Sequence, residues 1–123
     1  MRHPDTPNPH LLKRVHLEQM QQAAQRILDY TAGMDFTEFA ADGRTQDAVR
    51  YNLHQFGLIA ATLHKSAREE LTELDWRSIL DLPDLVSRLH FGIQDEILWD
   101  LIQRTLPYWL VVLEETLGPP PAP

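Results

Sequence analysis

Apolar residues recur at intervals of three and four along most of the chain, which is the spacing of one face of an α-helix. Three long stretches carry this pattern, and they predict helices near residues 10–32, 45–64 and 94–117. Gly33 and Gly118 follow the first and third stretches, where glycine is a common C-terminal cap. No run of alternating apolar and polar residues is long enough for a strand, so the pattern predicts an all-α protein.

Shorter helices are expected between the long ones, because pairs of residues have the spacing of helix N-terminal caps. Asp35 with Glu38, and Ser66 with Glu69, each match a capping box, in which two side chains bind each other's backbone amides. Thr45 is expected to begin the second long helix. Asp75 is expected to cap a further turn of helix.

Two prolines and one glycine lie where they constrain the predicted helices. Pro83 is expected in the first turn of a separate short helix, the position at which proline is best tolerated. Pro107 lies within the last stretch and predicts a kink there. Gly57 lies inside the second stretch, where it allows another helix to come close. The elements together predict an α-helical bundle, and a bundle this small often completes its core by forming a homodimer.

The length and composition indicate one domain. The chain has 123 residues, and 43% of them are hydrophobic, enough for one core. Residues 10–117 are expected to form a single helical domain, with a disordered, proline-containing arm at 1–9 and a disordered, proline-rich tail at 118–123. No apolar run has the length of a membrane span or of a signal peptide, and cysteine is absent. These features predict a cytoplasmic protein without a membrane partner.

Charge is distributed unevenly along the chain. The net charge is −7, and nearly all the excess acidity lies after residue 68. Residues 1–68 carry eight Lys and Arg against seven Asp and Glu, whereas residues 69–123 carry three against eleven. Proteins that grip nucleic acid over a broad face usually present a basic stripe. Any contact with RNA is therefore expected to be local, or to depend on a partner.

Four segments resemble the HepT-like minimal HEPN proteins, which pair with nucleotidyltransferases of the MNT type. These segments occur in the family's order and read TAGMDFTEFAADGRTQDAVRYNL at 31–53, Gly57 to Ala61, DWRSILDL at 75–82 and FGIQDEILWDLIQRTLP at 91–107. The resemblance implies an up-and-down, HEPN-like helical bundle, a homodimer and an MNT-type nucleotidyltransferase antitoxin as partner. It therefore implies a subunit of a toxin–antitoxin-type module.

The resemblance also implies a chemistry, cleavage of RNA without a metal. Active members carry Arg, four residues, His, one residue and Tyr. The His takes a proton from a 2′-OH and the Arg steadies the developing charge. In this chain the Arg, His and Tyr positions read Pro83, Arg88 and His90, and the Asn that normally follows the Arg is Asp84. In some members the partner modifies the Tyr with AMP, and here that position is a His. The family motif is thus degraded.

Three residues are weak candidates for a rebuilt site: Arg88, His90 and His54. Arg88 and His90 restore an Arg and a His close to the usual place, but they can cooperate only if the helix ends there. His54 lies four residues after Arg50 on one helical face, so the two can meet. The simpler reading of each is an exposed polar residue or a cation at a helix C-terminus. No residue spacing predicts a metal site or a bound cofactor.

Three functional hypotheses follow. The first is a HepT-like subunit with a degraded catalytic motif, whose work is dimerisation and partner binding, with RNA binding as a further role. The second is an active ribonuclease toxin that uses Arg88 with His90, or His54, in a rebuilt site. The third is a helical adaptor that makes no contact with RNA.

Overall fold

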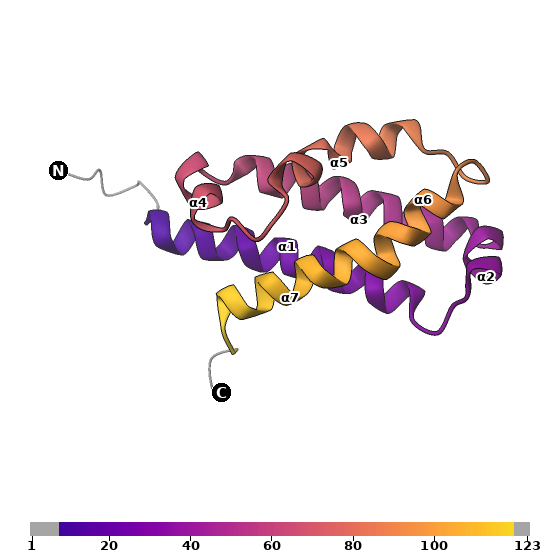
Figure 1. Ribbon diagram of the computed structural model, residues 1–123, viewed down its shortest axis with the longest axis horizontal. Coiled ribbons are helices and arrows are strands. Elements are labelled where there is room, and N and C mark those ends of the chain that lie inside the picture. The colour runs from indigo at the N-terminus through magenta and orange to yellow at the C-terminus, as the bar shows by residue number, and fades with distance from the viewer. Residues whose placement is uncertain (1–7, 120–123) are drawn as a thin grey trace.

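Residues 8–119, which the computed structural model describes, form an up-and-down helical bundle without a strand (Figure 1). Each of the four long segments, α1, α3, α5 and the joined α6–α7, runs antiparallel to the one before it. Helix α3 packs against α1 and α5, and α1 packs against α7. The helices are α1 (Pro9–Thr31), α2 (Phe36–Ala41), α3 (Gly43–Thr62), α4 (Lys65–Glu70), α5 (Trp76–Arg88), α6 (Asp95–Asp100) and α7 (Leu106–Leu117).

The all-α class and the three long helices predicted from the sequence are confirmed. The predicted N-terminal arm lies outside the described residues except for Asn8 and Pro9, which cap and begin α1. The predicted tail lies outside them from residue 120 onward, and Gly118 ends α7 with a φ of 74°. Within residues 8–119 no helix is both long and apolar enough to cross a membrane.

The N-terminal caps agree with the sequence in two places and differ in two. Asp35 and Glu38 form the expected capping box, and Asp75 caps α5. Helix α3 begins at Gly43 rather than at Thr45, because the Asp42 carboxylate accepts the Thr45 backbone N–H at 3.0 Å and its hydroxyl at 2.7 Å. The predicted Ser66–Glu69 capping box is wrong.

Helix α4 is capped by His64 in place of Ser66. The Ser66 backbone N–H donates to Nδ1 of His64 at 3.1 Å, and the two side chains lie 2.8 Å apart. An imidazole nitrogen that accepts an amide hydrogen carries no proton, so the proton of neutral His64 lies on Nε2. Histidine is not among the residues that usually cap helices, which is why the sequence pointed to the serine.

Pro83 lies inside α5 and does not begin a separate helix, so that prediction is wrong. The helix starts at Trp76, and its apolar side packs inward through Ile79 and Leu82, both of which are buried. Proline has no amide hydrogen, so the Ile79 carbonyl lacks its usual partner four residues later. Burial of Ile79 and Leu82 before Pro83, together with the packing of Leu85 and Val86 after it against the core, keeps the helix continuous despite that loss.

The last predicted helix is divided by a π-helical turn, Leu101–Thr105, that lies between α6 and α7. The backbone N–H of Leu106 donates to the carbonyl of Leu101, five residues earlier. Pro107 follows directly, within the first turn of α7. A π-helical turn is one of the established ways in which a helix adjusts its course. The irregularity that Pro107 predicted is therefore present, and it takes this form.

The core runs along the length of the bundle and is built from the apolar faces of α1, α3, α5 and α7. Phe56 of α3 stacks on Trp109 of α7, with ring centroids 5.7 Å apart and an interplanar angle of 10°. Phe39 of α2 lies against Trp99 of α6 at 5.2 Å and so closes one end of the bundle. Fully buried residues include Leu17, Met20, Ile27, Leu53, Ile79, Leu82, Ile102, Leu106 and Leu113.

The Asp42 cap is expected to make the free energy of unfolding depend on pH in the acid range. Hydrogen bonds from the backbone and side chain of Thr45 hold the pKa of Asp42 below its ordinary value. A carboxyl whose folded-state pKa is depressed stabilises the fold above its unfolded pKa of about 3.9, and this contribution is lost as pH falls through the folded-state value. Urea unfolding at a series of pH values should show a smaller loss of stability below about pH 4 for Asp42→Asn than for the wild type.

Thr45→Val tests the cause, because it removes the hydroxyl donor and leaves the backbone donor. It is expected to reduce the acid sensitivity only in part. Identical pH profiles for the wild type and Asp42→Asn would show that the cap contributes nothing through its charge.

Candidate functional site

Pro83, at the position where the resemblance expects an Arg, is a contact between helices. Its ring lies on α3 at Gly57, where a Cβ atom on the glycine would be 2.5 Å from Cδ of Pro83 and 2.9 Å from the Ile79 carbonyl oxygen. Real Cβ atoms do not approach other atoms so closely, so the two helix backbones touch here. The position is used for packing α5 against α3 and presents no cation to a ligand.

Arg88, at the position of the expected His, is the last residue of α5 and is held by carboxylates on its own helix. Its guanidinium lies 3.4 Å from Asp84 and 4.0 Å from Asp81. All three side chains are well exposed, so these ion pairs contribute little to stability. The side chain extends along α5, and Arg88 does not line the hollow that contains His90.

His90 lies just beyond α5 and lines a shallow hollow of about 320 Å³ between α5 and α3. Arg50 of α3 lines the same hollow and donates from Nη1 to the Leu89 carbonyl at 2.8 Å. The other terminal nitrogen of Arg50 forms an ion pair with Asp47. The structure therefore brings His90 together with Arg50, a combination that the sequence did not suggest.

His54 is half-buried on α3, and within residues 8–119 its ring forms no hydrogen bond. The expected pairing with Arg50 is not formed, because Arg50 turns toward Asp47 and the end of α5. The three weak candidates thus lie in three different settings. Arg88 is ion-paired along its own helix, His90 is in the hollow with Arg50, and His54 stands apart.

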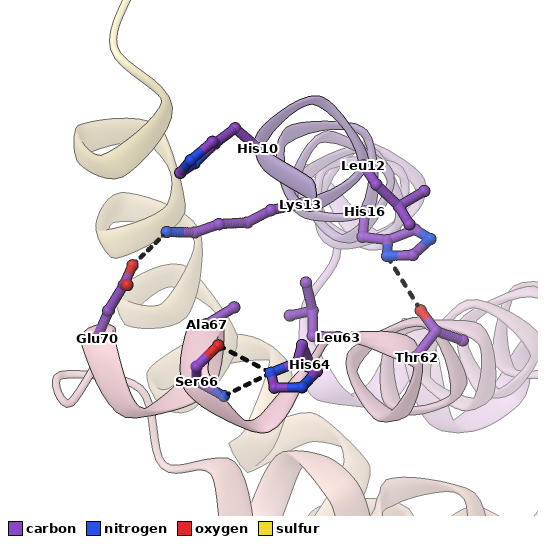
Figure 2. A pocket seen from close by; sticks show the side chains of 10 residues that line it. All are labelled: His10, Leu12, Lys13, His16, Thr62, Leu63, His64, Ser66, Ala67 and Glu70. Carbon is purple, nitrogen blue, oxygen red and sulfur yellow. Dashed lines mark hydrogen bonds and ion pairs between the residues drawn. The ribbon is translucent and has the colours of Figure 1, made fainter. Parts of the chain in front are cut away.

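A further hollow lies elsewhere, between the start of α1, the end of α3 and α4 (Figure 2). It has a volume of about 580 Å³. Lys13 spans one side and pairs with Glu70 at 2.6 Å, while Nδ1 of His16 lies 3.3 Å from the Thr62 hydroxyl on the other. The pKa of Glu70 is lowered, chiefly by the hydrogen bond from Lys13.

This hollow contains three imidazoles, those of His10, His16 and His64, and none of the candidate residues predicted from the sequence. Figure 2 shows that the rings do not converge on a point: His64 turns toward Ser66, His16 toward Thr62, and His10 lies on the far side of Lys13. Among residues 8–119 no group of three His, Asp or Glu side chains could hold a metal ion. The polar groups here mainly bind one another and join α4 to α1.

Comparison with known proteins agrees with this fold. The Ribonuclease HepT-like family matches the chain over residues 20–116. The chain belongs to the HepT-like ribonuclease family. The match spans α1 to α7, apart from the first half of α1 and the last residue of α7. No solved structure gave a significant match.

Relatives of this HepT-like protein are found in archaea and bacteria. A protein of Methanocaldococcus jannaschii assigned as an RNase is 29% identical over 104 residues, which are 85% of this chain and 86% of that protein. A protein of Thermococcus cleftensis assigned as ribonuclease HepT is 26% identical and is covered over 90% of its length. A Caldanaerobacter subterraneus protein assigned as an RNase is 26% identical, over 76% of this chain and 84% of that protein.

Sequence reasoning missed the setting of His90 in this HepT-like protein. Arg50 lies on α3 and His90 follows α5, so nothing in their spacing brings them together. The only available signal was Gly57, which predicted a close approach to α3 without saying which helix approaches. With α5 as the approaching helix, its C-terminus passes Arg50, and the Leu89 carbonyl takes the Arg50 hydrogen bond.

Proposed function

We propose that this HepT-like chain is the HEPN subunit of a toxin–antitoxin-type module and that it has exchanged RNA cleavage for binding. In this proposal it forms a homodimer, binds an MNT-type nucleotidyltransferase antitoxin and retains a local capacity to bind RNA. Its family membership supports descent from ribonucleases. The residues at the motif positions support the loss of cleavage.

The packing of Pro83 against Gly57 carries this proposal. A Cβ atom placed on Gly57 would lie only 2.5 Å from Cδ of Pro83. Pro83 therefore fills the contact between α3 and α5. At the His position, Arg88 cannot act as a general base, because a guanidinium stays protonated in proteins. The site therefore has neither the cation nor the base of the family's reaction where that reaction requires them.

Dimerisation and partner binding are supported by the surface. Large apolar side chains remain exposed on all the long segments, among them Leu11, Leu58, Leu80 and Val111. Such side chains are available for burial by a second subunit or a partner, although apolar groups scattered singly are also normal on a protein surface. We expect light scattering to give the mass of two chains. A monomer that shows no binding to the product of an adjacent nucleotidyltransferase gene would contradict both roles.

Expression in cells tests the loss of toxicity. The chain alone is expected to cause no growth arrest, and His90→Ala and His54→Ala should grow like the wild type. Growth arrest that either substitution relieves would instead establish an active toxin. A catalytically intact HepT-like protein, expressed to the same level, is the matched positive control.

One observation favours a second candidate, the active ribonuclease. His90 and Arg50 line one hollow, so an imidazole and a guanidinium are available together. There His90 would take the 2′-OH proton while Arg50 faced the phosphate. Arg50, however, is already bound to Asp47 and to the Leu89 carbonyl. These bonds would have to break before Arg50 could serve a phosphate, which is why we place cleavage second.

A further inference from the structure

Another hollow adjoins the one that contains His90, and its lining lacks the acidic residues that line the hollows of His90 and of Lys13. It lies between α1 and α3, has a volume of about 340 Å³ and is lined by Gln19, Gln22, Ala23, Arg26, Tyr51, Asn52, Gln55 and Ile59. None of these residues is acidic, although the chain as a whole has a net charge of −7. Four of them carry a side-chain amide, and one is an arginine.

Tyr51 joins the two hollows. It lines both the α1–α3 hollow and the His90 hollow. It is 63% exposed, so its side chain is accessible to solvent at the border of the two hollows. An aromatic side chain this exposed contributes little to the core and is available to a ligand.

Two groups in the α1–α3 hollow are available to a ligand. Within residues 8–119 no carboxylate lies within ion-pairing distance of Arg26, as is also true of Arg44, Arg68 and Arg77, whereas Arg14, Arg50, Arg88 and Arg104 are paired. Asn52 is only 5% exposed and donates from Nδ2 to the Ala48 carbonyl at 2.9 Å. Its Oδ1 accepts no hydrogen bond from the described residues and is not one of their buried unpartnered atoms, so it is an acceptor open to solvent.

We infer that the α1–α3 hollow is a binding subsite for one unpaired nucleotide of a single-stranded RNA, with Tyr51 as the ring on which its base stacks. The inference rests on the proposed RNA binding and gives it a location. Side-chain amides carry both donors and acceptors, as base edges do. An exposed aromatic ring suits an unstacked base, and an unpaired arginine suits a phosphate.

The shared position of Tyr51 gives the bound strand two directions in which to continue. A base stacked on this ring places the next phosphate toward either Arg26 on one side or the hollow of Arg50 and His90 on the other. Duplex RNA cannot use such a site, because its bases are already stacked. The subsite therefore accounts for local RNA binding by a chain that has no basic stripe.

Fluorescence anisotropy with short, labelled, single-stranded homopolymer RNAs tests this inference on the full chain. Tyr51→Ala is expected to weaken binding about tenfold or more, the effect of removing one base–aromatic stack. Tyr51→Phe keeps the ring and should bind like the wild type. Arg26→Ala should weaken binding to all sequences and reduce the salt dependence by about one phosphate contact. Tyr108→Ala is the matched control, because Tyr108 lies on α7 and is also largely exposed, at 54%.

The outcomes separate this inference from the proposed function. If the wild type binds RNA and Tyr51→Ala binds equally well, the subsite is wrong while RNA binding stands. If the wild type binds no single-stranded RNA, the RNA-binding part of the proposed function fails and the subsite fails with it. If Tyr51→Ala converts a dimer to a monomer in light scattering, the hollow holds a second copy of the chain. Unchanged circular dichroism for each variant excludes unfolding as the cause.

Discussion

Replacing Phe56 with alanine is expected to lower the free energy of unfolding by about 3–5 kcal/mol, the usual cost of removing a buried phenyl ring. The Phe56 side chain is fully buried, and its ring stacks on Trp109. The pair joins α3 to α7, two helices that are not adjacent in the chain. The substitution removes the stack and leaves a cavity where the two helices face each other.

Urea unfolding followed by circular dichroism measures this loss, and tryptophan fluorescence reports on the surroundings of Trp109. Leu58→Ala is the matched control, because Leu58 lies two residues away on the same helix and is 43% exposed. It should change stability by less than about 1 kcal/mol. If the two variants were equally stable, Phe56 would not be the core contact that the structure shows.

Gly57→Ala is expected to destabilise the fold by about 1–3 kcal/mol through overpacking. This result is informative because alanine is intrinsically better than glycine in a helix, by about 1 kcal/mol. The new Cβ would meet Pro83 Cδ at 2.5 Å and the Ile79 carbonyl oxygen at 2.9 Å, and the second of these atoms is backbone. Helices α3 and α5 would have to move apart, and the end of α5 would shift relative to Arg50.

Gly43→Ala is the control for this substitution, measured by the same unfolding experiment. Gly43 begins α3, and a Cβ there would meet only the side chain of Phe91, at an ordinary 3.6 Å. It should be neutral or slightly stabilising. A Gly57→Ala variant as stable as the wild type would contradict the close contact of α3 with α5, and with it the packing role of Pro83.

The sequence predicted the helices well because their positions depend on local spacing. The apolar stripes of α1, α3 and α7 are visible without any knowledge of their neighbours. The wrong predictions concern a helix cap and a proline, and at both positions the protein uses an arrangement that is uncommon in helices. His64 caps α4 in place of Ser66, and Pro83 continues a helix that propensity alone would interrupt, because burial of Ile79 and Leu82 outweighs the lost hydrogen bond.

The site was less predictable, because it depends on which helices come together. The substitutions at 83, 88 and 90 could be recognised in the sequence, but their surroundings could not. The Pro83 contact with Gly57 joins two helices, as does the shared hollow of His90 and Arg50. The α1–α3 hollow around Tyr51 likewise needs both helices placed. Helical spacing predicts which residues share a face and does not specify the residue that another helix brings opposite.

Incubation of the purified chain with single-stranded RNA, followed by denaturing electrophoresis, tests the central claim most directly. The account predicts that the RNA remains intact, and that the wild type, His90→Ala and His54→Ala give the same result. The matched positive control is a catalytically intact HepT-like protein purified in the same way. Cleavage by the wild type that is lost in His90→Ala or in His54→Ala would contradict the account and establish a rebuilt active site.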